Sequence, residues 1–357
     1  MKLVQNYSQY PEMFDEMFDK KGITRDIYKN FEKFLNKSSV KNLNSMKDFA
    51  QQFFMNQGVT FTVYDNDEGV EKIFPFDIIP RIISYSDWKI IESGIKQRIK
   101  ALNLFIKDIY HEQFILNDNI IPAELIISNP NYLREMRNIN VSNDIYTHIS
   151  GIDLIRNEEG KFFVLEDNLR TPSGVSYMLE NREITRRLYP EMIPREKVQP
   201  ISDYPNLLYN KLKSLSNKKN PVVVMLTPGL YNSAYYEHTA LARLMGVELV
   251  EGSDLLVDNH YVFMKTAGGL KTVDVIYRRI DDDFLDPLNF KADSVLGVAG
   301  IMDSFRQGNV ILVNCPGAGI ADDKAIYTYV PDMISYYLNE KPILNNIKTY
   351  KLTNKDE

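Results

Sequence analysis

Cysteine and histidine are scarce in this sequence. Cys315 is the single cysteine among 357 residues, so no intrachain disulfide can form and a thiolate zinc cluster is excluded. The four histidines, His111, His148, His238 and His260, are scattered along the chain, which argues against a histidine metal site or a catalytic triad. The candidate functional residues therefore come from other residue types.

Long apolar runs and an excess of positive charge are also missing. The start, MKLVQNYSQY, has no apolar signal core, and no stretch reaches the length of a membrane span. We therefore expect no membrane partner and a cytoplasmic location. The net charge of -6 argues against nucleic acid as a partner, although metal ions and local arginines or lysines could still neutralise a bound nucleotide.

What is present is an ordinary globular composition. Hydrophobic residues make up 44% of the chain and charged residues 25%, which argues against wholesale disorder. The length of 357 residues suffices for two domains or for one large α/β unit.

Hydrophobic spacing in the first half of the chain predicts helices and a strand pair. Apolar residues recur at helical spacing through residues 1–60 and again from residue 86 to residue 110, where Ser86 or Asp87 would cap the helix. Residues 59–83 alternate as two strands around the turn signal NDEG. The early apolar positions include Phe14, Phe18, Ile27, Phe31 and Phe34.

The second half predicts a parallel sheet. A polar, proline-rich stretch at residues 194–205 marks a candidate domain boundary, and the run NPVVVMLTPG after it is typical of a buried parallel strand. A helix from Ser233, closed by Gly246, and the strand VELVEG follow. A hairpin over Gly268 and Gly269 and the buried strand NVILVNCPGAG come later. This βαβ order predicts a Rossmann-like unit with ligands near the carboxyl ends of the strands.

The stretch GIDLIRNEEGKFFVLEDN, residues 151–168, predicts a β-hairpin. Two apolar strands flank the turn signature NEEG, and a loop of two or four residues would place Gly151 opposite Glu166 and Asp153 diagonal to it. Side chains alternate along a strand, so Asp153, Glu166 and Asn168 would share one face. A loop of odd length would break this register.

Two carboxylates and an amide oxygen on one face fit a hard cation. Mg²⁺ prefers such oxygen ligands and completes its octahedron with water and phosphate oxygens. A general acid/base pair and a salt-bridged strand end are the alternatives. The asparagine beside the carboxylates favours the metal over the acid/base pair.

Other polar groups remain open between function and structure. Arg98, in the middle of the helix 86–110, is either solvated or directed into a site. The strand end YRRIDDD suits ligand contacts or an ion-pair network. Asp322, Asp323 and Lys324 open a helix, where acidic residues act as caps. Asn232 and Ser233 cap another helix or contribute to a substrate site.

Several long blocks, in order and over nearly the whole chain, resemble the circularly permuted ATP-grasp family. They are FPFDIIPRII, GIKQRIKALNLFIKDIY, GIDLIR with VLEDNLRTPSGVSYMLENR, NSAYYEHTALARLMGVELVEGSDL, DVIYRRIDDDFLDPL and GAGIADDKAIYTYVPDMI. The resemblance implies an α/β (α+β) fold, a circularly permuted ATP-grasp with an inserted Rossmann-like pre-ATP-grasp domain. It also implies an ADP-forming carboxylate–amine or carboxylate–thiol ligase related to glutathionylspermidine synthetases.

The resemblance also implies cofactors and domains. The cofactors are ATP and Mg²⁺, and the substrates are a small-molecule or peptide carboxylate and an amine. Residues 1–195 would form the ATP-grasp part with the metal-binding hairpin, residues 196–335 the Rossmann-like domain, and residues 336–357 the start of a nucleotide-binding subdomain.

Site residues follow from the same resemblance. In the synthetases an Asp and a Glu-x-Asn followed by Thr-Pro hold Mg²⁺ on ATP, and here Asp153, Glu166, Asn168 and the Thr-Pro at 171–172 match. Ser173 is placed with them in the cofactor site. Arg170 and Arg182, then Arg98, are the candidate catalytic arginines. The candidate substrate-binding residues are Arg81, Asn232, Ser233, Arg278, Arg279, Asp282 and Asp323.

Two departures from the family limit these expectations. The synthetases have an arginine two residues before the metal-binding Asp, where this chain has Gly151. The family also continues into a segment with a phosphate-contacting lysine and a glycine-rich loop, whereas this sequence ends at Glu357. We therefore expect reduced nucleotide affinity, and the alternatives to a ligase are a non-catalytic binding or scaffold protein and a metal-dependent hydrolase.

Overall fold

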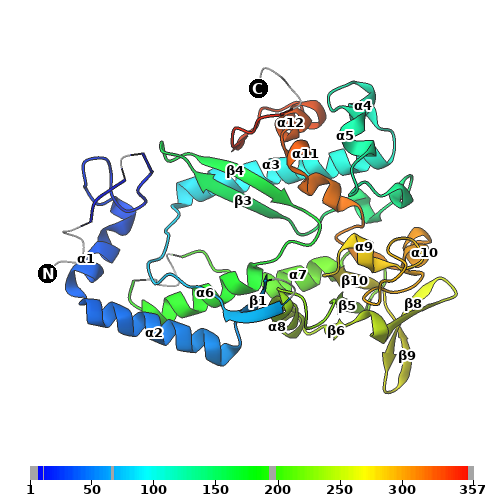
Figure 1. Cartoon of the computed structure of the whole chain (residues 1–357), viewed down its shortest axis with the longest axis horizontal. Coiled ribbons are helices and arrows are strands. Elements are labelled where there is room, and N and C mark those ends of the chain that lie inside the picture. Colours follow the sequence, from blue (N-terminus) through cyan, green and yellow to red (C-terminus); the bar gives the residue numbers. More distant parts are fainter. Residues whose placement is uncertain (1–6, 11, 66–67, 193–197, 353–357) are drawn as a thin grey trace. The chain divides into compact units, whose positions relative to one another are not determined.

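The computed structural model describes residues 7–10, 12–65, 68–192 and 198–352 (Figure 1). The chain forms two compact units, which are described separately. Unit 1 comprises Met1–Lys89, Arg156–Phe162 and Gly174–Tyr204, and unit 2 comprises Ile90–Ile155, Phe163–Ser173 and Pro205–Glu357. The last change of unit, between residues 204 and 205, lies at the end of the polar stretch 194–205 that the sequence marks as a boundary, of which residues 194–197 lie outside the described residues. The division at 195 and 335 stays a prediction.

Unit 1 is mainly helical, with one strand pair. Strands β1 and β2 are antiparallel, with Thr60 opposite Ile73, as the alternation predicts; residues 66–67 of their turn lie outside the described residues. The elements of unit 1 are η2 (Asp26–Tyr28), α1 (Lys29–Lys37), α2 (Val40–Gln57), β1 (Thr60–Asp65), β2 (Glu68–Ile73), the start of α3 (Tyr85–Tyr110) and α6 (Val175–Leu188).

The helical prediction for residues 1–60 is only partly confirmed. Phe31 and Phe34 lie on α1 and pack edge-on against Tyr189. Residues around Phe14 and Phe18 form no helix, because aspartate side chains take the backbone N–H groups that a helix would need. Asp15 accepts from the N–H groups of residues 17 and 18, and Asp19 accepts from those of residues 21 and 23.

The long helix α3 begins near its predicted start but with a different cap. Ser84 is the cap, because its side-chain oxygen accepts from the Asp87 N–H at 3.0 Å and its carbonyl accepts from the Trp88 N–H at 2.9 Å. Ser86 and Asp87 lie inside the first turn. Ser84, two residues before Ser86, therefore has the capping role that the sequence predicted for Ser86 or Asp87.

Unit 2 contains a four-stranded parallel sheet in the order β11-β10-β5-β6. All four residues of β5 are buried, as expected for a strand covered on both faces. The helix after it, α8, ends at Gly246 in the left-handed region (φ 69°), which confirms the predicted βαβ order. The strands β7, β8 and β9 form a separate antiparallel sheet with the predicted hairpin at Gly269.

A third sheet has the order β12-β4-β3. The short strand β12 pairs in parallel with β4, with Asn345 opposite Phe163 and Asn346 opposite Val164. Besides the rest of α3, the elements of unit 2 are α4 (Phe114–Asn117), α5 (Ala123–Ile127), η3 (Arg134–Met136), η4 (Ser142–Asp144), β3 (Gly151–Arg156), β4 (Phe162–Asn168), α7 (Tyr204–Lys213), β5 (Val223–Leu226), α8 (Tyr235–Met245), β6 (Glu248–Val250), η5 (Gly252–Asp254), β7 (Leu255–Asp258), β8 (Tyr261–Thr266), β9 (Gly269–Thr272), β10 (Val275–Arg278), α9 (Asp282–Leu285), α10 (Ile301–Arg306), β11 (Ile311–Val313), η6 (Ala318–Asp322), α11 (Lys324–Tyr327), α12 (Val330–Leu338) and β12 (Asn345–Asn346).

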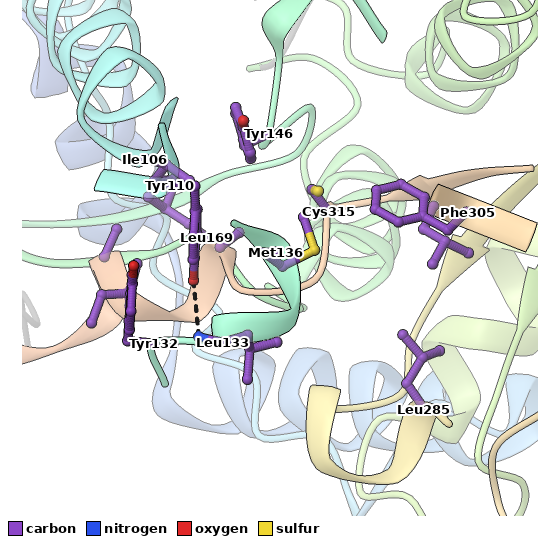
Figure 2. Packing of buried hydrophobic residues seen from close by; sticks show 14 of the residues in the cluster. Ile106, Tyr110, Tyr132, Leu133, Met136, Tyr146, Leu169, Leu285, Phe305 and Cys315 are labelled. Atoms are coloured by element: carbon purple, nitrogen blue, oxygen red, sulfur yellow. Dashed lines mark hydrogen bonds between the residues drawn. The ribbon is translucent and has the colours of Figure 1, made fainter. Parts of the chain in front are cut away.

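The core of unit 2 joins α3 to the parallel sheet (Figure 2). The Tyr110 ring stacks on Tyr132, and its hydroxyl accepts from the Leu133 N–H at 3.2 Å and donates to the Gly317 carbonyl at 3.1 Å. Cys315 is buried in the same cluster, and burial raises the pKa of its thiol far above the usual range. The single cysteine is therefore an inert core residue.

Candidate functional site

The predicted hairpin is present as β3 and β4, but its loop has three residues. The Asn157 N–H donates to the Lys161 carbonyl at 3.0 Å, and Gly160 lies in the left-handed region (φ 83°). The expected loop of two or four residues is therefore wrong, and Lys161 pairs with Asn157 instead of Arg156. At Gly151 the nearest side-chain atoms are those of Pro172 and Asn168, and Glu166 is not among its nearest neighbours.

The three oxygen-bearing side chains nevertheless lie together. The carboxyl group of Asp153 interacts electrostatically with that of Glu166, and the Asn168 side-chain N–H donates to Glu166 Oε1 at 3.4 Å. Strand β3 has six residues and β4 has seven, so β4 holds one residue more than its partner. Such an extra residue compensates for an odd loop, because each one-residue shift changes the face on which a side chain lies.

The electrostatics of this cluster differ from one carboxylate to the next. Burial and the neighbouring Glu166 carboxylate hold the pKa of Asp153 above its usual range. The Lys324 ammonium and the Asn168 amide hold the pKa of Glu166 below its usual range. Glu166 is therefore paired with a cation, whereas Asp153 forms no ion pair with the residues that the structure describes.

Lys324 is the first residue of α11, which follows the last strand of the parallel sheet in the chain, and it was not predicted to reach this site. Its Nζ lies 2.9 Å from Glu166 Oε2 and donates to the Leu165 carbonyl at 2.8 Å. Asp323 before it caps α11 by accepting from the Ala325 N–H, and it also accepts from the Asn129 side chain. The substrate contact predicted for Asp323 stays a prediction.

Asp322 fixes the chain just after Asn168. Its carboxylate accepts from the Leu169 N–H at 2.6 Å and from the Arg170 N–H at 3.4 Å. Burial raises the pKa of Asp322 to about 6, although both N–H groups act in the opposite direction. The direction in which β4 ends is therefore set by a residue more than one hundred and fifty positions away.

Asn314 connects both strands of the hairpin to the end of β11. Its side-chain oxygen accepts from the N–H groups of His148 and Ile149 at 2.8 and 3.0 Å, just before β3. Its side-chain nitrogen donates to the carbonyls of Ile149 and Leu169 at 2.6 and 2.7 Å. No pattern in the sequence singled out this residue, because its partners are backbone groups far away in the chain.

Arg98 points away from solvent and toward β4. Its guanidinium pairs with Asp167 through two hydrogen bonds of 2.6 Å and donates to the Asn346 side-chain oxygen at 2.7 Å. The side chains of Arg98 and Asp167 are 1% and 0% exposed. Of the two interpretations left open by the sequence, solvation is therefore wrong, and the arginine is directed into the interior beneath the strand that carries Glu166 and Asn168.

Arg170 and Ser173 follow β4 closely. The Arg170 Nε lies 3.5 Å from Asp281 Oδ1, and its side chain packs over Gly319. Thr171 donates to the same aspartate at 3.3 Å. Ser173 is exposed. The catalytic and cofactor roles of Arg170 and Ser173 stay predictions.

The two arginines at the end of β10 differ in their surroundings. Arg278 is fully buried and donates to the carbonyls of Ile280, Asn314 and Cys315, while it pairs with Asp282 at 2.7 Å. It therefore ties the ends of β10 and β11 together. The substrate roles predicted for Arg278 and Asp282 stay predictions.

Arg279 lies beside the loop that follows β4. It donates to the Pro172 carbonyl at 2.6 Å and pairs loosely, at 3.4 Å, with the buried Glu237. Its Nε is buried without a hydrogen-bond partner among the described residues. The N-cap of α8 is Ala234, so the predicted capping by Asn232 or Ser233 is wrong. The Asn232 side-chain oxygen accepts from the Ala234 N–H just before the helix, and Ser233 is exposed.

Two of the candidate arginines belong to unit 1. Arg81 pairs with Glu16 at 2.6 Å and is half exposed. Arg182 donates to the Gln199 carbonyl at 2.7 Å, and burial lowers the pKa of its guanidinium. The substrate role of Arg81 and the catalytic role of Arg182 stay predictions.

His238 in α8 gives the first testable prediction. Its ring lies 2.8 Å from the Thr227 hydroxyl, and burial lowers its pKa to about 3. Below pH 6.5 the unfolded chain gains a proton that the folded chain excludes, so stability falls with falling pH by about 1.4 kcal/mol per pH unit. In urea unfolding, wild type should lose about 2 kcal/mol more than His238→Gln between pH 7 and pH 5. Equal losses in both proteins would contradict this.

The donor chemistry of the Asp153, Glu166 and Asn168 cluster fits a hard divalent cation. In the part of the chain that the structure describes, no group of three or more His, Cys, Asp or Glu side chains is placed to hold a metal ion. A Mg²⁺ ion at this cluster would therefore need the Asn168 side-chain oxygen as its third protein ligand. Water and phosphate oxygens would supply the remaining ligands. The amide would have to turn, because its N–H now faces Glu166.

Comparison with known proteins identifies the family. A family model described as circularly permuted ATP-grasp type 2 matches residues 80–357, so the chain belongs to this family, as the resemblance indicated. An uncharacterized Synechocystis protein is 50% identical over 339 residues, which are 94% of this chain and 70% of that protein. An uncharacterized Mycobacterium tuberculosis protein is 49% identical over 350 residues, 98% of this chain and 63% of that protein.

One further relative and one solved structure are similar to this chain. A protein named putative glutamate–cysteine ligase from Frankia alni is 36% identical over 351 residues, 98% of this chain and 40% of that protein. The structure of a glutathione synthetase-like effector from Globodera pallida, in the apo form, matches with a TM-score of 0.58 and 11% identity. The match covers 85% of this chain and 69% of that one. This second likeness concerns the fold alone. Within the described residues, no helix combines the length and the apolar character needed to cross a bilayer.

Proposed function

We propose that this chain contributes the metal- and substrate-facing parts of an ATP-dependent carboxylate–amine ligase. The observation that carries the proposal is the convergence of Asp153, Glu166 and Asn168 in a chain of the ATP-grasp family. The ligase class is supported by the name of the Frankia relative. Because the chain spans less than two thirds of several relatives, the whole reaction is a proposal for a protein of the relatives' full length.

The proposed reaction joins a carboxylate to an amine at the expense of ATP. The γ-phosphoryl group passes to a carboxylate oxygen and ADP leaves, after which the amine displaces phosphate from the acyl phosphate and loses a proton. When bound, Mg²⁺ would neutralise charge on the β- and γ-phosphates. A small amino acid or peptide as the carboxylate substrate and a cytoplasmic setting belong to the same proposal.

The residues of the chain would act mainly by positioning. Asp153, Glu166 and Asn168 would hold the metal, and the buried Arg98–Asp167 pair fixes the strand from which two of them project. Arg170, which follows β4 by two residues and whose backbone is held by Asp322, is the candidate for the phosphoryl oxygens.

At the carboxyl ends of β5 and β10, Arg279 keeps a buried N–H without a partner among the described residues, which suits the carboxylate of a substrate. That edge of a parallel sheet is where ligands of such folds bind.

Calorimetric titration with Mg²⁺ and a non-hydrolysable ATP analogue tests the proposal. The wild-type chain should bind, and Asn168→Ala should weaken binding at least about tenfold, because one of three protein ligands is lost. Glu248→Gln is the matched control, since it removes an exposed carboxylate on β6. The control should bind as wild type does.

Three outcomes separate the alternatives. Binding that is unchanged in Asn168→Ala would rule out the cluster as the metal site. Binding that depends on Asn168, without phosphate release from ATP by a protein of the relatives' full length in amino-acid mixtures, would favour a non-catalytic binding protein. Turnover that requires metal but no nucleotide would favour a hydrolase.

A further inference from the structure

The ammonium of Lys324 is a positive charge beside carboxylates that are proposed to bind a metal cation. It pairs with Glu166 at 2.9 Å, and its side chain is 54% exposed. Asp153 and Glu166 are neighbouring carboxylates, and the Lys324 ammonium is the cation that compensates part of their negative charge.

Lys324 is held in this place by the fold. The Leu165 carbonyl accepts from its Nζ at 2.8 Å, and the Tyr327 ring lies beneath it at 5.2 Å. Tyr327 is itself fixed, because its hydroxyl donates to the Val164 carbonyl and accepts from the Ile347 N–H. Asp323, which caps α11, fixes the backbone on the other side of the lysine. A flexible lysine that met Glu166 by chance would not have these supports.

We propose that Lys324 makes the site selective for a divalent cation that already carries a polyanion, and that it repels the bare cation. This inference rests on the proposed function, because the polyanion is the nucleotide. Two carboxylates and one ammonium leave the cluster with a single net negative charge, which is little for a bare divalent cation. Such an ion would also lie against Glu166, within a few ångströms of the ammonium.

The same ammonium favours the metal once phosphates accompany it. A nucleoside triphosphate with one divalent cation has a net negative charge, so the interaction with Lys324 changes from repulsion to attraction. The lysine thereby couples the two ligands: each binds better when the other is present, and the coupling is reciprocal. Without the lysine, the aspartate–glutamate pair would bind free metal ions. These ions would compete for the site with the nucleotide that already carries a metal ion.

Two binding measurements test this without any activity assay: the electron paramagnetic resonance signal of the free ion follows binding of Mn²⁺ alone, and calorimetry follows binding of Mn²⁺ already complexed by the analogue. Lys324→Met should tighten binding of Mn²⁺ alone about tenfold and weaken binding of Mn²⁺ with a non-hydrolysable ATP analogue about tenfold. Lys324→Arg keeps the charge and should keep most of the wild-type preference. Lys271→Met, an exposed lysine on β9, is the matched control and should behave as wild type.

Two additional measurements locate the effect and exclude unfolding. Thermal unfolding should show that Lys324→Met is folded. Adding Asn168→Ala to Lys324→Met should abolish the gained Mn²⁺ affinity, because the gain belongs to the cluster.

The outcomes distinguish the inference from the proposed function. If wild type binds Mn²⁺ with the analogue but Lys324→Met binds bare Mn²⁺ no tighter, the inference is overturned and the proposed function stands. If Lys324→Met gains Mn²⁺ affinity while no protein binds the analogue, a metal site remains but both nucleotide claims fail. If no variant binds Mn²⁺ at all, the cluster is not a metal site and both proposals fall.

Discussion

Arg98→Met should lower the free energy of unfolding by about 3 to 5 kcal/mol, because it leaves the Asp167 carboxylate buried without its partner. Both side chains are almost completely buried, and the pair is joined by two hydrogen bonds of 2.6 Å. Asn346 would also lose the donor to its side-chain oxygen. Urea denaturation, followed by circular dichroism, measures the loss.

A double variant separates lost pairing from lost packing. Arg98→Met with Asp167→Leu removes both charges and should recover much of the stability, since a buried ion pair can be replaced by apolar side chains at little cost. Lys96→Met is the control on the same helix. Its lysine is exposed and paired with Glu92, so the change should be less than about 1 kcal/mol. An Arg98→Met protein as stable as this control would refute the prediction.

Asn314→Ala should cost about 3 to 5 kcal/mol, because five backbone groups lose a hydrogen-bond partner. These are the N–H groups of His148 and Ile149 and the carbonyls of Ile149, Leu169 and, at 3.5 Å, Arg170. The same groups flank β3 and β4, so binding of Mg²⁺ with the ATP analogue should weaken as well. Denaturation and calorimetry on one preparation measure both effects.

The control for Asn314 is another asparagine that bonds to the backbone. Asn309 donates to the His260 carbonyl at 2.8 Å in an exposed contact, where water can replace it. Asn309→Ala should therefore cost less than about 1 kcal/mol and leave binding unchanged. Equal losses at Asn309 and Asn314 would show that the hairpin does not depend on Asn314.

The sequence predicted correctly those helices and strands that depend on residues close together in the chain. Strand β5 was predicted from a run of β-branched residues and helix α8 from its spacing and its closing Gly246, because burial on both faces and a left-handed cap leave such marks. The hairpin of β3 and β4 was predicted from alternation around a turn signature. In each case the residues that cause the structure are neighbours in the sequence.

Side-chain competition with the backbone explains the missed elements. Asp15 and Asp19 occupy helical-looking positions, yet each binds nearby N–H groups and stops a helix from forming. The loop of the hairpin was predicted with the wrong length because NEEG is compatible with a three-residue turn that places Gly160 in the left-handed region. Spacing alone does not distinguish these cases.

Distant partners account for what the sequence did not predict about the site. The hairpin pattern and the family resemblance predicted that the side chains of Asp153, Glu166 and Asn168 lie close together. The contact of Lys324 with Glu166 joins residues on separate elements, and the sequence indicated only that Lys324 opens a helix. Asp322 and Asn314 act on backbone groups, which carry no sequence signal of their own.

The pairing of β12 with β4 has a consequence for how the protein is made. Asn346, which accepts from Arg98, follows it by 248 positions. At ordinary rates of translation, roughly 10 to 50 seconds separate the emergence of the two residues from the ribosome. During that interval the arginine lacks one of its acceptors, and from the emergence of β4 until that of β12 the strand β4 has an open edge in the nascent chain.

An open strand edge is a template for pairing with other chains. Synthesis that stalls before residue 345 should therefore release a product prone to self-association, and chaperones that cover strand edges should matter most in that interval.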